Sequence, residues 1–102
     1  MTTTIRPEVT RKSEWYISRD RYYELKHFCL QWHEWRDDPR GYRAMVRAAC
    51  IEADPSLADY ILKAVTEGYS YTYLKTVMHI PCGRSMYFDR YRKFFWLLSK
   101  IR

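Results

Sequence analysis

The side chains best suited to chemistry in this sequence are cationic, and they gather in its last third. Residues 69–102 carry seven Lys or Arg and a single acidic residue, Asp89, whereas residues 1–68 carry 11 residues of each sign. The formal net charge of +6 therefore belongs entirely to residues 69–102. Guanidinium and ammonium groups bind phosphates, so this segregation predicts a surface that binds nucleic acid. A solvated basic helix is the alternative explanation.

The elements that must position these cations are two helices joined by a tight turn. Gly68 suits the left-handed end of a preceding helix, and Ser70 suits the N-cap of a short helix over residues 71 to about 78. Pro81 breaks that helix, because proline lacks an N–H and disfavours helix in the residue before it. A second helix then runs from about Cys82 to the C-terminus. This is the spacing of a helix-turn-helix, whose second helix enters the DNA major groove.

In this helix-turn-helix, at about residues 68–102, the faces of the second helix follow from a rotation of about 100° per residue. Its apolar side should face the body of the domain, and it consists of Tyr87, Tyr91, Phe94, Leu98 and Ile101. Its N-terminal turns should enter the groove, where Arg can bind guanine O6 and N7 together. The predicted base-reading residues are Arg84, Ser85, Met86, Asp89 and Arg90. The predicted phosphate contacts, which give register and salt dependence, are Ser70, Tyr71, Tyr73, Lys75, Arg92 and Lys93.

Residue types for a metal site or a cysteine nucleophile are present but poorly arranged. His79 and Cys82 form an H-x-x-C pair, whereas zinc needs about four ligands and no C-x-x-C pair supplies half a site. Cys82, near a helix N-terminus and close to His79, could have a lowered pKa. No third catalytic residue or oxyanion motif accompanies the pair. We therefore expect no enzymatic activity, metal, cofactor or small-molecule ligand.

Helix signals also fill the chain upstream of residue 68. Ser18 is a plausible N-cap for a helix from about Arg19 to Arg36. Two Asp-Pro pairs, at 38–39 and 54–55, combine a capping residue with proline at the first helical position, and they start helices that end at Ala53 and Glu67. The sequence thus predicts an all-α fold, a compact bundle of about five helices with a long last helix.

Length and composition set the domain organisation and exclude several classes. Residues 1–13 are Thr-rich and are predicted to be a flexible N-terminal arm, and residues 14–102 a single helical domain. A hydrophobic content of 47% is too high for a disordered chain. No apolar run approaches the roughly 20 residues that span a bilayer, and no apolar secretory signal opens the chain. Three irregularly spaced cysteines argue against a disulfide framework. We expect a cytoplasmic protein with no membrane partner.

Three tryptophans leave two interpretations open. Trp32 and Trp35 belong to an apolar stripe of the first helix, which favours a place in the core, although tryptophan is also enriched in interface hot spots. Trp96 falls on the polar side of the last helix, where a dimer contact or packing against the first helix would explain it. These three residues are the candidates for a partner surface, and they leave a homodimer open.

The helix-turn-helix segment resembles a known family. The run GYSYTYLKTVMHIPCGRSMY (68–87) is similar to the helix-turn-helix of sigma-factor region four, with the matching positions Gly68, Ser70, Leu74, Val77 and Ile80. One departure is Ser85, where sigma-like recognition helices usually carry an aliphatic residue. It suggests a one-residue shift that makes Met86 the inward contact.

A wider resemblance covers most of residues 15–101. The runs YYELKHFCLQWHEW (22–35) and YILKAVTEGYSYTYLK…IPCGRSMYFDRYRKFFWLL (60–98) resemble small proteins of Gram-positive phages and prophages, related to RinA/ArpU-type late-gene transcription regulators. The resemblance implies a phage-encoded transcription factor that binds double-stranded DNA at a promoter, at the nucleoid of the bacterial host, and that can contact host RNA polymerase. The alternative class is a protein-interaction module. Its basic aromatic face would bind a host protein, either an RNA polymerase subunit or a nucleic-acid-binding defence nuclease.

Overall fold

The computed structural model describes residues 15–102, and every regular element in this range is helical. The elements are α2 (Arg19–Leu30), the short 3₁₀ helix η1 (Trp32–Glu34), α3 (Tyr42–Ala53), α4 (Ala58–Glu67), α5 (Tyr71–Thr76) and α6 (Arg84–Ile101). The predicted all-α bundle of about five helices with a long last helix is confirmed. The predicted arm over residues 1–13 lies outside the described residues.

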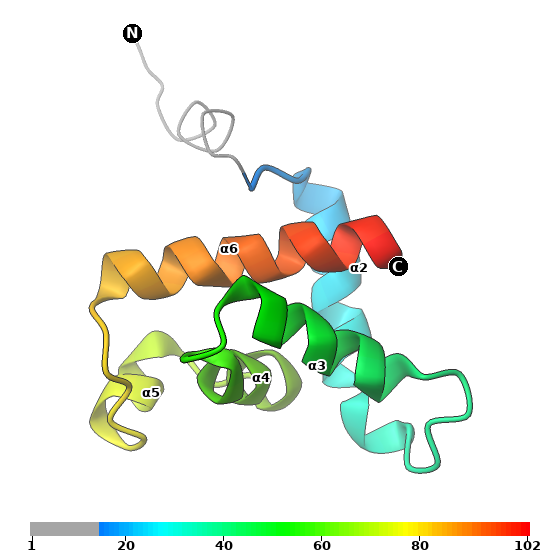
Figure 1. Ribbon diagram of the computed structural model, residues 1–102, viewed down its shortest axis with the longest axis horizontal. Coiled ribbons are helices and arrows are strands. Elements are labelled where there is room, and N and C mark those ends of the chain that lie inside the picture. The colour runs from blue at the N-terminus through cyan, green and yellow to red at the C-terminus, as the bar shows by residue number, and fades with distance from the viewer. Residues whose placement is uncertain (1–14) are drawn as a thin grey trace, which may run out of the picture.

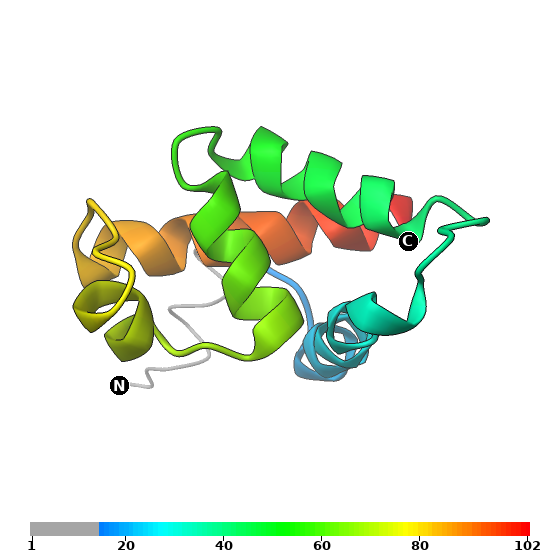
Figure 2. The same ribbon diagram turned by 90° about the horizontal axis from the view of Figure 1, so that it is seen from below.

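The long helix α6 is the element against which the others pack. Helix α3 lies alongside it, as two perpendicular views show, and α2 runs across its C-terminal half (Figures 1 and 2). Helix α4 packs beneath α3 (Figure 1). Helix α5 contacts α4 and lies near the N-terminal end of α6 (Figure 1). The core where these helices meet includes the fully buried side chains Leu25, Val46, Ile61, Leu74, Phe94 and Leu98. The N-terminal end of α6 extends past α3, so its first turns are free of the helix that supports the rest.

The first helix ends earlier than the sequence predicts. The expected helix from Arg19 to Arg36 is wrong beyond Leu30, where the chain tightens into η1. The reason is aromatic packing, because this turn brings the Trp35 ring within 4.7 Å of Phe28 and 5.1 Å of Tyr42. Such ring contacts stabilise a chain reversal that helix propensity alone does not predict.

Both Asp-Pro signals mark the approach to a helix rather than its first residue. Helix α3 begins at Tyr42 instead of Pro39. The Asp38 carboxylate nevertheless caps it, because it accepts hydrogen bonds from the backbone N–H groups of Arg43 (2.9 Å) and Ala44 (3.3 Å). Asp38 reaches them from a left-handed backbone conformation (φ 47°), which Asp tolerates better than most residues. Asp54 similarly forms a turn, and α4 begins at Ala58.

The predicted caps around residue 70 are confirmed, whereas the turn that follows is longer than predicted. Gly68 has a left-handed φ of 78° and donates to the Ala64 carbonyl, and the Ser70 hydroxyl accepts from the Tyr73 N–H at 3.1 Å. Helix α5 ends at Thr76, and residues 77–83 lead to α6. A compact helix-turn-helix has a three- or four-residue turn. The longer connection is anchored by Ile80, which is buried and donates to the Leu74 carbonyl at 3.0 Å.

None of the helices within residues 15–102 is both long and apolar enough to cross a membrane.

Candidate nucleic-acid interface

Most cations of the last third are available to an external anion. Within residues 15–102, the ion pairs of this segment involve Arg90 alone. The other six cations have no carboxylate partner in the described part of the chain, and they are Lys75, Arg84, Arg92, Lys93, Lys100 and Arg102. Because the one acidic residue of the segment, Asp89, is already paired with Arg90, little local charge neutralises the rest.

Arg90 instead ties α6 to the corner between α3 and α4. Its Nε donates to the Asp54 carboxylate at 3.1 Å, and its Nη1 donates to Asp89. Partial burial acts to raise the pKa of Asp54, but hydrogen bonds from Ser56 and Arg90 outweigh it and hold that pKa below its ordinary value. The structure therefore gives Arg90 and Asp89, two of the predicted base-reading residues, an internal partner each.

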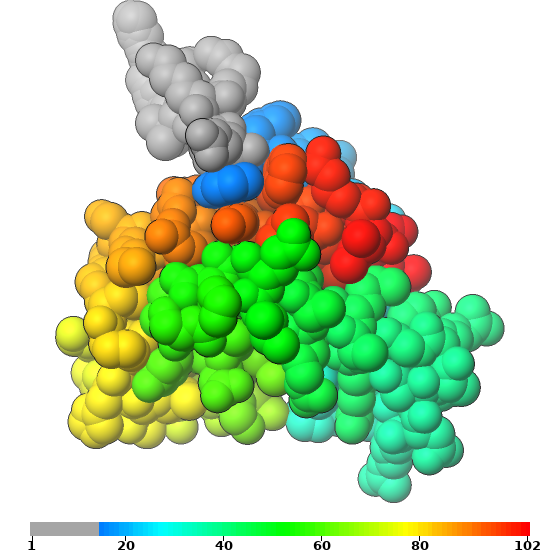
Figure 3. Space-filling model, viewed as in Figure 1, coloured from blue at the N-terminus to red at the C-terminus, as the bar shows by residue number. Residues whose placement is uncertain are grey.

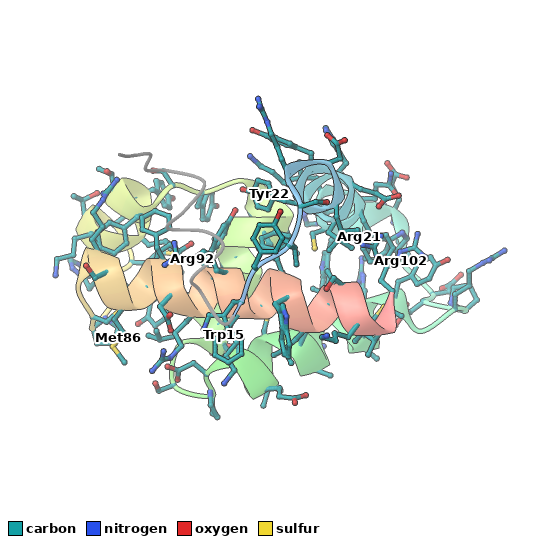
Figure 4. All side chains as sticks on the ribbon, turned by 90° about the horizontal axis from the view of Figure 1, so that it is seen from above. Trp15, Arg21, Tyr22, Met86, Arg92 and Arg102 are labelled. Atoms are coloured by element: carbon teal, nitrogen blue, oxygen red, sulfur yellow. The ribbon has the colours of Figure 1, made fainter. Side chains whose placement is uncertain are left out.

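The five predicted base-reading residues do not lie on one face of α6. At about 100° per residue, Met86 and Arg90 lie outside the arc of about 100° that contains Arg84, Ser85, Phe88 and Arg92. Figure 4 shows Met86 and Arg92 on opposite sides of α6. We call Arg84, Ser85, Phe88 and Arg92 the basic face of α6. Arg84 and Ser85 were predicted as base-reading residues and Arg92 as a phosphate contact, whereas Phe88 was in neither predicted set.

The inward register of α6 is also settled by burial. Tyr87 is 1% exposed, whereas Met86 is 45% exposed. The shift that would have made Met86 the inward contact is therefore wrong. Ile101, expected to face the body of the domain, is 55% exposed because it lies at the last turn of α6, and Phe95, 1% exposed, is buried instead.

Aromatic rings position the first cation of the basic face. The Arg84 guanidinium lies 5.2 Å from the Phe88 ring centroid and 5.5 Å from that of Tyr71, in the geometry of cation–π contacts. The Tyr71 hydroxyl donates to the Cys82 carbonyl at 3.0 Å, which joins α5 to the start of α6. Tyr71, predicted as a phosphate contact, thus uses its hydroxyl proton within the fold and presents a ring rather than a donor.

The remaining predicted phosphate contacts are spread over two elements. Tyr73 and Lys75 are exposed on α5, where the Tyr73 ring lies 4.2 Å from that of Tyr69. The Ser70 hydroxyl is the cap of α5. Arg92 is exposed on the basic face, whereas the Lys93 ammonium group lies over the Trp15 ring at 5.2 Å.

The predicted partner-surface tryptophans lie in two separate places. Trp96 forms an edge-to-face contact with Trp15 at 5.2 Å, and the Lys100 ammonium group lies 4.4 Å from its ring. Figure 3 shows the first described residues, in blue, against the orange atoms of α6, and Figure 4 places Trp15 over that helix. This contact explains why Trp96 lies on the polar side of α6, and no local sequence pattern predicted it.

Trp32 and Trp35 lie instead where α2 gives way to η1. Both are half-buried and pack against the core. The guanidinium groups of Arg43 and Arg47 lie 5.0 and 5.3 Å from the Trp32 ring. Both rings are therefore tied to the core and partly exposed.

The cysteine and histidine side chains within residues 15–102 belong to no candidate metal-binding cluster. No three His, Cys, Asp or Glu side chains within residues 15–102 could hold a metal ion. Partial burial, followed by the negative charge of Asp54, raises the pKa of Cys82. This direction is opposite to the lowered pKa that its position near a helix N-terminus suggested.

No family model, curated protein or solved structure matches this chain.

Proposed function

We propose that the chain is a sequence-specific DNA-binding protein, a transcription regulator of phage or prophage origin that places the basic face of α6 in the major groove. The observation that carries this proposal is the set of cations in residues 69–102 that have no carboxylate partner within residues 15–102. Such a surface attracts phosphates and releases their counterions on binding. The resemblance to sigma region four and to RinA/ArpU-type regulators agrees with it, and it points to a bacterial host and its RNA polymerase.

The basic face offers different chemistry at each position. Arg84 and Arg92 carry guanidinium forks that suit guanine or phosphate. Ser85 can donate to or accept from a base edge, and the Phe88 ring can contact a thymine methyl group. Lys75 is exposed on α5, the helix that precedes α6, and its ammonium group suits the phosphate backbone.

The experiment is selection of bound fragments from a random pool of duplex DNA, followed by measurement of the affinity of the selected sequence against salt concentration. The proposal predicts an enriched motif and a salt slope of several units, about 0.9 for each neutralised phosphate. A two-fold symmetric motif would show that two copies bind together. Binding without a motif that vanishes near physiological salt would contradict the proposal.

A second candidate function, a protein-interaction module, is favoured by one separate feature. Trp15 and Trp96 form an aromatic pair on α6, with the Lys93 and Lys100 ammonium groups over their rings. Tryptophan among cations is typical of interface hot spots. The partner in this case would be a host RNA polymerase subunit or a nucleic-acid-binding defence nuclease. Loss of purified polymerase binding in Trp96→Ala, with DNA selection unchanged, would assign this surface to a protein partner.

A further inference from the structure

A pocket of about 350 Å³ opens between α2, the link at residues 68–70, α5 and α6. Its lining combines aromatic rings, hydroxyl groups and two cations, and it contains no carboxylate. The rings are those of Tyr22, Tyr69, Tyr71, Tyr87, Phe88 and Tyr91. The cations are Lys26 and Arg84. Pockets of this size accommodate small organic molecules.

The aromatic wall is held in place by contacts within the fold. The Tyr71 hydroxyl donates to the Cys82 carbonyl, and the Tyr71 ring centroid lies 5.4 Å from that of Tyr87 and 6.1 Å from that of Phe88. On the α2 side, the hydroxyl groups of Tyr22 and Tyr91 share a hydrogen bond of 3.0 Å. A wall fixed in this way can stack on a flat ligand without losing further side-chain freedom.

Both cations border the rings, and no carboxylate neutralises them within residues 15–102. The Lys26 ammonium group lies 5.9 Å from the Tyr22 ring centroid, and the Arg84 guanidinium lies over Tyr71 and Phe88. The pocket therefore favours a ligand that carries negative charge next to a flat ring. A nucleotide has both features, because its base stacks on aromatic side chains and its phosphate pairs with cations.

We propose that this pocket binds a single unpaired nucleotide, with the base among the rings of the aromatic wall and the phosphate beside Lys26 and Arg84. The inference rests on the proposed function only for the source of the nucleotide. The pocket shares Arg84 and Phe88 with the basic face of α6, so a nucleotide that is unstacked from a bound duplex lies within reach. A free mononucleotide has the same chemistry and is the other source.

The test compares three probes by fluorescence anisotropy or calorimetry. They are a fully paired duplex, a series of the same duplex with one unpaired adenosine moved stepwise along it, and free deoxyadenosine monophosphate. At one position the unpaired adenosine should tighten binding roughly tenfold over the paired duplex, the effect expected for stacking of one base. Free deoxyadenosine monophosphate should bind weakly and, as a competitor, should reduce the affinity gained from the unpaired adenosine.

Two pairs of variants locate the site. Lys26→Gln should remove the gain, and Lys26→Arg should keep it because it retains the charge. The matched control is Lys63→Gln on α4, an exposed position that changes the net charge equally but lies outside the pocket. Phe88→Leu, which keeps apolar bulk but no ring, should also lose the gain, and circular dichroism checks that it stays folded.

The outcomes separate this inference from the proposed function. Equal affinity for paired and unpaired duplexes at every position, without binding of the free nucleotide, would overturn the pocket and leave duplex binding intact. Binding of the free nucleotide that is lost in Lys26→Gln and kept in Lys63→Gln, with no affinity for duplex DNA, would support the pocket and contradict duplex binding. A gain that survives both Lys26→Gln and Phe88→Leu would place the unpaired base elsewhere and overturn the inference.

Discussion

The Arg90 Nε lies 3.1 Å from the Asp54 carboxylate, and this contact joins the middle of α6 to the corner between α3 and α4. Asp54 is only 12% exposed and Arg90 33%. Buried apolar side chains set which side of α6 faces the core, and this pair holds the neighbouring side, which carries Arg90, against that corner.

Replacing Arg90 with Ala should destabilise the fold by about 1 kcal/mol, because it removes a partly exposed ion pair and leaves the more buried Asp54 with fewer donors. Chemical denaturation of the variant measures the loss. Arg92→Ala on the same helix, where the side chain is exposed and unpaired with any carboxylate in the described residues, should stay within about 0.5 kcal/mol of the wild type. Equal losses in the two variants would contradict a structural role specific to Arg90.

The Asp54 contact should also depend on pH. Its pKa in the fold is lowered, because the hydrogen bonds from Ser56 and Arg90 outweigh the effect of burial. A carboxyl group of this kind adds stability above its unfolded pKa, near 4, and the addition is lost as pH falls through the folded pKa. The stability difference between the wild type and Asp54→Asn should therefore be largest at neutral pH and shrink in acid. Asp59→Asn, at an exposed position on α4, is the charge-matched control and should lower the stability at neutral pH less than Asp54→Asn does.

Phe95 should be a principal core residue although its position was not predicted. Its ring lies in edge-to-face contact with Tyr22 at 5.0 Å and with Tyr91 at 5.1 Å. Phe95→Ala should cost about 3–5 kcal/mol of unfolding free energy, since it leaves a cavity where α2 packs on α6. Ile101→Ala, at the exposed end of the same helix, should cost far less. A small loss in Phe95→Ala would mean that the α2–α6 contact is looser than the structure shows.

Cysteine reactivity distinguishes a structural from a catalytic thiol. Burial raises the pKa of Cys29 to about 12 and raises that of Cys50 as well. For Cys82, partial burial and the Asp54 carboxylate raise the pKa above its ordinary value of 9.0. Alkylation of the native protein, followed by mass spectrometry, should be slow at neutral pH and accelerate in alkali, first at Cys82. Asp54→Asn removes a negative charge that raises the pKa of Cys82, so it should speed the alkylation of Cys82. Fast labelling of Cys82 at neutral pH would indicate an activated thiolate.

Features set by neighbouring residues could be predicted from the sequence. Gly68 and Ser70 act through backbone groups within four residues of themselves, so their residue types were sufficient. The same holds for the all-α fold, which follows from apolar spacing and caps. The side chains through which the central turns of α6 face the core, such as Phe94 and Leu98, were predicted for the same reason.

Features set by distant residues could not be predicted. The end of α2 at Leu30 depends on rings that α3 brings against Trp35, and the Trp15–Trp96 contact joins opposite ends of the described chain. The pairing of Arg90 with Asp54 spans 36 residues. Because of that pairing, the guanidinium of Arg90, a predicted base-reading residue, is bonded within the fold. The charge pattern identified the most cationic segment, but it could not show which of its side chains are paired within the fold.

The register of α6 on DNA provides the most direct test of the proposed interface. If the basic face enters the major groove, Arg84→Ala should relax base preference by about 1–3 kcal/mol at one position of the selected site. Arg92→Ala should weaken binding to all sequences and lower the salt slope by about 0.9 if it contacts a phosphate. Met86→Ala, on the opposite side of the helix, should leave both preference and slope unchanged. All three can be measured by competition binding against the selected duplex and a scrambled one.

The opposite pattern would point to a different orientation of α6. A loss of base preference in Met86→Ala, with Arg84→Ala unchanged, would mean that the side carrying Met86 faces the groove. The Arg90–Asp54 contact lies on that side, so such a complex would have to break it. Arg90, freed from Asp54, would then face the groove as a cation, so Arg90→Ala would weaken DNA binding. The proposed orientation keeps Arg90 paired with Asp54 and predicts little change in DNA affinity. The size of the Arg90→Ala effect on DNA affinity therefore helps to decide between the two faces.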